Sequence, residues 1–124
     1  MEKQNNRKIG DVYEVLVIAY LEEKGYKIIE HNFRCHIGEI DIIALYQKYI
    51  VFIEVKYRKN MNHGNPLEAV TTKKQKIISK CATYYLLIHP MYQNIGVRFD
   101  VVGVQKEKLT HQMIHIENAF EYSE

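Results

Sequence analysis

The sequence predicts an α/β (α+β) domain in which helices flank a mixed central sheet, and three observations support this. The chain has 124 residues, the size of one domain. Hydrophobic residues make up 47% of it and charged residues 26%, which is enough for one core and excludes a disordered chain. The periodic segments follow the order helix, three strands, helix, two strands. We therefore treat residues 1–124 as one domain, with residues 1–6 and 121–124 as flexible ends.

The first helix is predicted over residues 7–24. Asn5 and Asn6 are suitable N-cap residues, and Gly25 suits the position that follows a helix C-terminus. Apolar side chains recur at helical spacing at Ile9, Val12, Tyr13, Leu16 and Tyr20.

Three strands are predicted to follow, over residues 26–31, 39–45 and 50–57. The second strand begins after Gly38 with an alternating run of apolar and charged residues. The third is rich in β-branched and aromatic residues and is typical of a central strand. Polar residues between these two strands indicate a tight reversal of the chain.

A second helix is predicted over residues 72–88, which end two residues before a proline. Two further strands are expected over residues 97–104 and 113–116, the latter being a short edge strand. Arg98 and Asp100 share one face of the first of these strands, and we interpret them as an ion pair.

The reversal between the second and third strands fixes their register. A two-residue loop at residues 47–48 pairs the residues on either side of it, and every further pair follows. In this register Asp41 lies opposite Glu54, and Glu39 lies opposite Lys56. Directly opposed residues have Cβ atoms about 5 Å apart, so we expect these charged groups to converge.

Both strands change from apolar to charged side chains at the same end of this face. Two opposed carboxylates repel each other and destabilise a sheet unless a positive charge lies between them. We therefore expect a divalent cation at Asp41 and Glu54, and oxygen ligands suit Mg²⁺ or Mn²⁺ better than zinc. Lys56, on the same side as Glu54, would orient or deprotonate a metal-bound water. The alternative is a structural ladder of ion pairs among Asp41, Glu54, Lys56 and Arg58.

Glu14 is a further candidate for this site because it lies on the apolar stripe of the first helix. It shares that face with Val17 and Leu21, where a carboxylate is rarely buried without a partner. The alternative is a salt bridge to an arginine, or a side chain that reaches solvent.

Positive charge is concentrated around this site. Residues 56–80 carry seven Lys or Arg against the single Glu68, a net charge of +6, whereas the whole chain has a net charge of +2. Such an excess is expected for a protein that binds a polyanion, although a solvated helix face has the same pattern.

We expect a cytoplasmic protein that does not insert into a membrane. No apolar run approaches the roughly 20 residues of a membrane span. The polar N-terminal residues show no secretory signal. The chain has two cysteines, without CxxC spacing, which favours a reducing compartment.

These residues resemble known families. Asp41, a spacing of twelve residues and then Glu54-Val55-Lys56 resemble the PD-(D/E)XK nuclease superfamily, with Ile40 in place of the proline. A helix-borne glutamate before the motif, here Glu14, resembles archaeal Holliday-junction resolvases. Over nearly the whole chain the sequence is similar to the YraN family of small bacterial proteins, through the segments Gly10-x3-Glu14, Asn32-x-Arg34, Gly38-Glu39-Ile40-Asp41-Ile42-Ile43, Phe52-Ile53-Glu54-Val55-Lys56-x-Arg58, Ala69-Val70-x3-Lys74-Gln75 and Arg98-Phe99-Asp100-Val101-Val102.

The resemblance implies the restriction endonuclease-like fold, with an αβββαβ core, and a catalytic role for the matching residues. Asp41 and Glu54 would be metal ligands, and Lys56 would be the catalytic lysine. Glu14 would be an additional ligand or would position a water molecule. We add Glu39 as an auxiliary acidic residue of the site.

The resemblance also implies a nucleic-acid-binding surface. Lys74 and Gln75 would face the phosphate. Arg34, Arg58 and Lys59 would clamp the nucleic-acid backbone, and ordinary surface charge is the alternative for these three cations.

The expected function is metal-dependent hydrolysis of phosphodiester bonds in structured or branched nucleic acid, with DNA as the expected substrate. Two alternatives stay open, namely a non-catalytic nucleic-acid-binding protein of the same fold and a small interaction protein of a larger complex. Many nucleases of this fold act as homodimers, although the residues of this chain indicate no interface.

Overall fold

The computed structural model describes residues 2–58 and 65–123, with side chains from residue 12 onward. The order helix, three strands, helix, two strands is as predicted, and the fold is of the α+β class. Among the described residues, no helix combines the length and the apolar character needed to cross a membrane. The elements are α1 Glu2–Glu23, β1 Lys27–Arg34, β2 Glu39–Tyr46, β3 Tyr49–Arg58, the short 3-10 helix η2 Pro66–Ala69, α2 Thr72–Ile88, the 3-10 helix η3 Pro90–Tyr92, β4 Gly96–Glu107 and β5 Thr110–Phe120.

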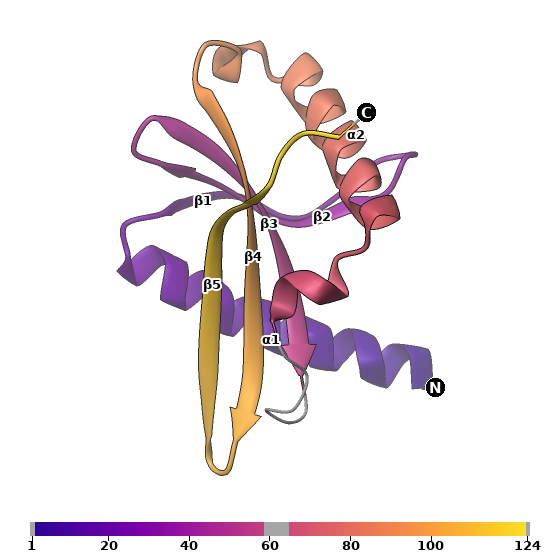
Figure 1. The fold of residues 1–124 in the computed structure, drawn as a ribbon, viewed down its shortest axis with the longest axis vertical. Helices are drawn as coiled ribbons and strands as arrows, with labels where there is room; N and C mark the ends of the chain where they lie inside the picture. The colour runs from indigo at the N-terminus through magenta and orange to yellow at the C-terminus, as the bar shows by residue number, and fades with distance from the viewer. Residues whose placement is uncertain (1, 59–64, 124) are drawn as a thin grey trace.

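A five-stranded sheet with the strand order β1-β2-β3-β4-β5 forms the centre of the fold (Figure 1). β3 and β4 are parallel, and the other neighbouring pairs are antiparallel. Parallel neighbours need a crossover connection, and the segment that contains α2 supplies it. The sheet is therefore mixed, as predicted.

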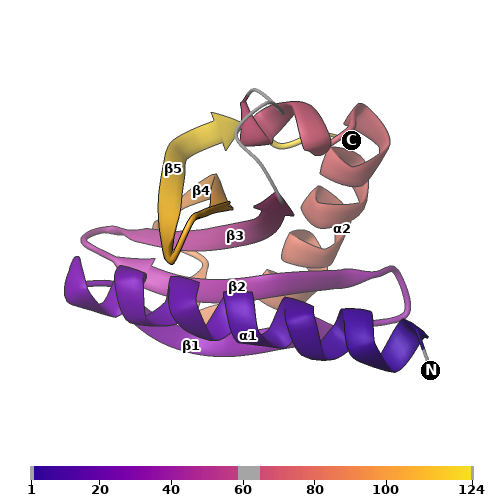
Figure 2. The same cartoon turned by 90° about the horizontal axis from the view of Figure 1, so that it is seen from below.

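The two helices pack against opposite faces of the sheet (Figure 2). α1 buries Val17 and Leu21 in the apolar cluster on one face. α2 buries Ile78, Cys81 and Tyr85 in the cluster on the other face. Successive side chains of a strand point to opposite faces, so β3 contributes apolar residues to both clusters.

Two elements are longer than predicted. α1 begins at Glu2 rather than at residue 7, because an N-cap preference of about 1 kcal/mol does not by itself end a helix. β5 covers Thr110–Phe120 rather than residues 113–116. β4 pairs with it along most of that length, so backbone pairing rather than apolar alternation sets the bounds of this strand.

The β2–β3 hairpin has the predicted register. Tyr46 pairs with Tyr49 across the turn, and the ladder continues in step to Ile42 and Ile53. Gln47, the first residue of the turn, has a φ of 54°, in the left-handed region that two-residue hairpin loops use.

β2 and β3 separate beyond the Ile42–Ile53 pair, where their ladder ends. β2 continues alongside β1, and Figure 1 shows it running across the picture while β3 and β4 run downward and β5 returns antiparallel to β4. Asn32 of β1 lies opposite Asp41 in the β1–β2 register and has a φ of 58°. The β1–β2 register stays in step on both sides of Asn32, and its irregularity lies between Ile28 and Glu30.

Arg98 and Asp100 of β4 form the predicted ion pair, which is buried. Arg98 donates hydrogen bonds of 2.9 and 2.8 Å to the two carboxylate oxygens. His115 Nε2 lies 2.7 Å from Asp100 Oδ2, and the Asn118 N–H donates to Oδ1 at 2.9 Å. Burial alone would raise the pKa of Asp100, but the hydrogen bonds with His115 and Arg98 outweigh burial and lower it. The network ties β4 to β5.

Asp100→Asn is expected to destabilise the fold by about 3–5 kcal/mol, because it leaves the Arg98 charge buried without its counter-ion. The folded state lowers the pKa of Asp100 below its usual 3.8. Its stabilisation is therefore present at neutral pH and is lost as the pH falls through the folded-state pKa. Urea unfolding at pH 7 and pH 3 measures this, and the gap between variant and wild type should narrow at pH 3.

Glu117→Gln removes an exposed carboxylate of the neighbouring strand and is the control, with an expected change below about 1 kcal/mol. An Asp100→Asn protein as stable as wild type at pH 7 would contradict the role given to this pair.

Candidate functional site

The candidate site lies where β2 and β3 separate. The Val55 N–H donates a hydrogen bond of 2.8 Å to Asp41 Oδ2. In a continued antiparallel ladder this N–H would meet the carbonyl of Ile40, because hydrogen-bonded pairs alternate from the turn. The β2–β3 ladder ends at the Ile42–Ile53 pair, before Ile40 is reached. The Asp41 carboxylate thus replaces a backbone acceptor and is held at the edge of β3.

Glu54 of β3 lies next to this carboxylate and is 6% exposed. Burial, a hydrogen bond with Asp41 and the negative charge of Asp41 together raise the pKa of Glu54 to about 9. The positive charges of Lys74 and Lys56 act in the opposite direction. The structure thus brings together two carboxyl groups and two lysines that come from β2, β3 and α2.

The two lysines approach Glu54 from different elements. Lys56 lies two residues further along β3 and is half-buried. Lys74 lies in the first turn of α2, where its N–H donates to the hydroxyl of the N-cap Thr71 at 3.1 Å. Gln75 follows it, and its amide nitrogen donates to the Val70 carbonyl at 3.0 Å. This bond ties the side chain of Gln75 to the segment before the helix.

Glu14 of α1 is buried, and one group close to it is a histidine of β1. Its Oε1 lies 3.7 Å from His31 Nε2. His31 pairs with Ile42, the residue after Asp41, so Glu14 meets the sheet one residue away from the carboxyl pair. Among the side chains of residues 12–58 and 65–123, however, no three His, Cys, Asp or Glu groups converge as a metal site would require. Of the three expected ligands, Asp41 and Glu54 are in contact and Glu14 is not grouped with them.

The expectation that Glu39 lies opposite Lys56 is wrong. The β2–β3 ladder ends before these positions, because β2 has turned away with β1. On the β1 side Glu39 pairs with Arg34, and Arg34 Nε lies 3.2 Å from Glu39 Oε2, with both side chains about half exposed. These two residues therefore neutralise each other near the β1–β2 turn.

Arg58 and Lys59 were both expected to contact the nucleic-acid backbone. Arg58 is the last residue of β3, half-buried and paired with Gln105 of β4. Lys59 lies outside the described residues.

Two residues that shape the site were not expected from the sequence. Asn32 has a left-handed backbone opposite Asp41, and His31 contacts Glu14. Asparagine tolerates the left-handed region better than other residues with a side chain, so Asn32 carried a weak local signal. The contact of His31 joins two elements and has no signal in the local sequence.

Comparison with known proteins finds relatives along most of the chain. The profile of a family described as "Uncharacterised protein family UPF0102" matches residues 13–104. A UPF0102 protein of Caldanaerobacter subterraneus subsp. tengcongensis is 47% identical over 123 residues, covering 97% of this chain and 100% of that protein. A UPF0102 protein of Lachnoclostridium phytofermentans is 44% identical, covering 94% and 96% of the two chains. One of Clostridium perfringens is 48% identical, covering 82% and 83%.

Glu54→Gln is expected to stabilise the metal-free protein more at pH 8 than at pH 5. The unfolded chain releases the Glu54 proton near the ordinary pKa of 4.5, whereas the folded protein holds it up to a pKa of about 9. The stability that comes from the protonated form is complete below the lower value and is lost as the pH rises towards the higher one. The neutral amide of Glu54→Gln has no such loss. The stability of the variant relative to wild type should therefore rise between pH 5 and pH 8 by on the order of 2 kcal/mol, or roughly 5–10 °C in Tm.

Thermal unfolding in EDTA at pH 5, 6.5 and 8 measures this difference. Glu39→Gln removes an exposed carboxylate of the neighbouring strand, and its Tm should follow that of wild type at every pH. A constant offset between Glu54→Gln and wild type across this range would contradict the raised pKa.

Proposed function

The chain belongs to the UPF0102 family, and we propose that it is a metal-dependent nuclease that hydrolyses phosphodiester bonds. The observation that carries the proposal is the Asp41–Glu54 pair with Lys56 and Lys74 beside it. Two carboxyl groups in contact, of which Glu54 is buried and Asp41 partly buried, are unfavourable in a sheet. A binding role for a cation explains why both are acidic, whereas a purely structural role does not.

The donor set of the site fits Mg²⁺ or Mn²⁺. Mg²⁺ is commonly held by one or two carboxylates together with waters and substrate phosphate, so Asp41 and Glu54 suffice as protein ligands. The Val55 N–H fixes the orientation of Asp41 by occupying its Oδ2. When bound, a divalent cation supplies a Lewis acid that polarises a phosphate oxygen and lowers the pKa of a coordinated water.

The lysines provide the remaining chemistry of the proposal. Lys56, two residues from Glu54 on the same strand, would orient the attacking water and stabilise the charge that develops on the phosphate. Lys74, at the N-terminal turn of α2, would hold the phosphate, assisted by the partial positive charge of the helix end. Gln75, expected to face the phosphate, is already tied to Val70 through its amide nitrogen and would support the turn that carries Lys74.

Branched or otherwise structured DNA is the substrate that we propose. Its support is the similarity to Holliday-junction resolvases and the net charge of +6 over residues 56–80. The second candidate is a nucleic-acid-binding protein without catalysis. It is favoured by one observation, that Glu14 does not join the carboxyl pair among the described side chains. That function predicts salt-sensitive binding without cleavage.

Cleavage should require Glu54 and Lys56. With Mg²⁺ or Mn²⁺ and a panel of hairpin, flap and four-way-junction substrates, we expect Glu54→Ala and Lys56→Ala each to lower the cleavage rate by at least about 100-fold. Gel assays of labelled DNA and RNA measure the rate. Glu39→Ala and Lys106→Ala remove exposed charges of the same sign elsewhere and should cleave like wild type. Cleavage that survives in both site variants would overturn the mechanism.

Metal binding should depend on the carboxyl pair and less on Glu14. Calorimetric titration with Mn²⁺ is expected to show one site that is lost in Asp41→Asn, because the amide removes a charged ligand. Glu14→Gln is expected to weaken the affinity by about tenfold, as residues that support a metal site usually do. Equal affinity in wild type and Asp41→Asn would exclude the proposed site.

A further inference from the structure

We propose that the exposed face of α2 binds a single strand of nucleic acid, and that a pocket at the far end of this face receives an unpaired base. The inference rests on the proposed function and extends it, because it names the class of substrate and its path. It is carried by a line of lysines, by the position of that line beside the candidate site, and by the lining of the pocket.

The lysine line consists of Lys73, Lys76 and Lys80, all of them exposed. They occupy positions i, i+3 and i+7 of α2, so they share one side of the helix and extend over about 10 Å. Residues 72–88 contain no Asp or Glu. No acidic side chain of this helix therefore opposes the attraction of the line for a phosphate backbone.

The lysine line begins beside the candidate site. Lys73 is the neighbour of Lys74, and the charge of Lys74 acts on the Glu54 carboxyl group. A nucleic-acid strand with one phosphate at the carboxyl pair would therefore place its next phosphates near Lys73 and then towards Lys80. The N-cap residue Thr71 fixes the first turn of α2, which carries both Lys73 and Lys74. The two lysines are therefore held in a fixed position relative to each other.

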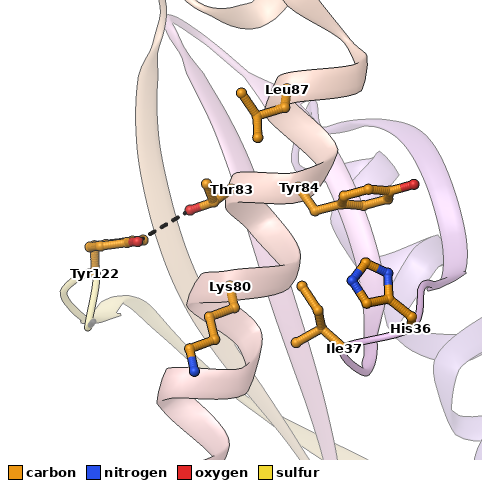
Figure 3. Close-up of a pocket in the computed structure, with 7 residues that line it drawn as sticks. All are labelled: His36, Ile37, Lys80, Thr83, Tyr84, Leu87 and Tyr122. Atoms are coloured by element: carbon orange, nitrogen blue, oxygen red, sulfur yellow. Dashed lines mark hydrogen bonds between the residues drawn. The ribbon is translucent and has the colours of Figure 1, made fainter.

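The line ends at a pocket of about 270 Å³. Figure 3 shows Thr83 and Tyr122 on one side, Tyr84 and His36 on the other, Leu87 above and Lys80 below. The rings of Tyr84 and His36 meet edge to face, with centroids 5.5 Å apart. The Thr83 and Tyr122 hydroxyls lie 3.4 Å apart. The lining of the pocket thus combines aromatic and aliphatic side chains, hydrogen-bonding groups and one cation, Lys80.

These properties fit a nucleobase next to a phosphate. Aromatic side chains stack on any base, and hydroxyl or imidazole groups bind its polar edge. The pocket is smaller than those that enclose drug-sized molecules, which begin near 300 Å³, and Lys80 would contact the phosphate of the same nucleotide. A base can enter only if it is unpaired and unstacked, so the ligand is a single-stranded segment such as a flap or the open part of a branch.

Binding is tested without cleavage, by fluorescence anisotropy in EDTA. The probes are a labelled dT 12-mer, an rU 12-mer, a DNA duplex and a 12-mer of abasic nucleotides. We expect the wild type to bind dT or rU roughly tenfold more tightly than the abasic strand, and more tightly than the duplex. The better of the dT and rU probes identifies the sugar. Equal affinity for the base-bearing and abasic strands would overturn the pocket.

Two sets of variants locate the path. Replacing Lys73, Lys76 and Lys80 by Gln should weaken binding and make the salt dependence of log K shallower by about 2, at about 0.7 for each lysine. Replacing Lys27 of β1, Lys106 of β4 and Lys108 of the β4–β5 turn by Gln removes the same charge at other exposed sites. This triple variant should lose less affinity and keep a steeper salt dependence than the α2 variant. Equal slopes for the two triple variants would overturn the lysine line.

Tyr122→Ala and Leu87→Ser change exposed walls of the pocket, with exposed fractions of 52% and 69%. Each should abolish most of the preference for base-bearing over abasic DNA. Leu109→Ser, at a residue that is 99% exposed, is the matched control and should keep it. A preference that persists in both pocket variants would place base recognition elsewhere. These binding measurements are independent of the proposed nuclease activity. If the protein cleaves no substrate but shows these binding differences, the nuclease proposal is wrong and the binding proposal stands.

Discussion

The hydrogen bond from the Val55 N–H to the Asp41 carboxylate is the contact on which the candidate site depends. Where β2 leaves β3, this N–H loses its place in the ladder, and a buried donor without an acceptor destabilises a protein by about 1–3 kcal/mol. A side chain at residue 41 that accepts the bond allows the strands to separate without that penalty. Because Val55 follows Glu54, the same contact sets the two carboxyl groups side by side.

The position of α2 depends on a second constraint, its close approach to the β1–β2 turn. A side chain at Gly38 would place its Cβ 2.6 Å from Ile77 Cγ2 and 3.4 Å from Cys81 Sγ. Cys35 and Cys81 Sγ lie 3.7 Å apart across the same contact, as free thiols. This packing holds the helix against the turn that leads into Asp41, so Lys74 and the carboxyl pair have a fixed relation although they are far apart in sequence.

Local signals in the sequence predicted some of these features and could not predict others. The bounds of α2 were predicted because an N-cap and a nearby proline mark its ends. The hairpin register was predicted because a short turn determines it. The pairing of Glu39 with Lys56 was wrong, because it assumed that β2 stays beside β3. The β2–β3 ladder ends at the Ile42–Ile53 pair, and this divergence has no local signal in the sequence. The contact of Glu14 with His31 joins separate elements and had no periodic signal.

α2 both packs in the core and carries a lysine of the site, so the core and the electrostatics of the site are coupled. One side of the helix places Ile78 and Tyr85 in the apolar cluster that extends to Phe52, two residues from Glu54. Glu54 itself is 6% exposed, and its burial is the largest cause of its raised pKa. The first turn of the same helix carries Lys74, whose charge opposes the shift. A substitution that loosens α2 would hydrate the carboxyl pair and withdraw a lysine from it at once, so it would change the charge of the site without altering any residue of the site.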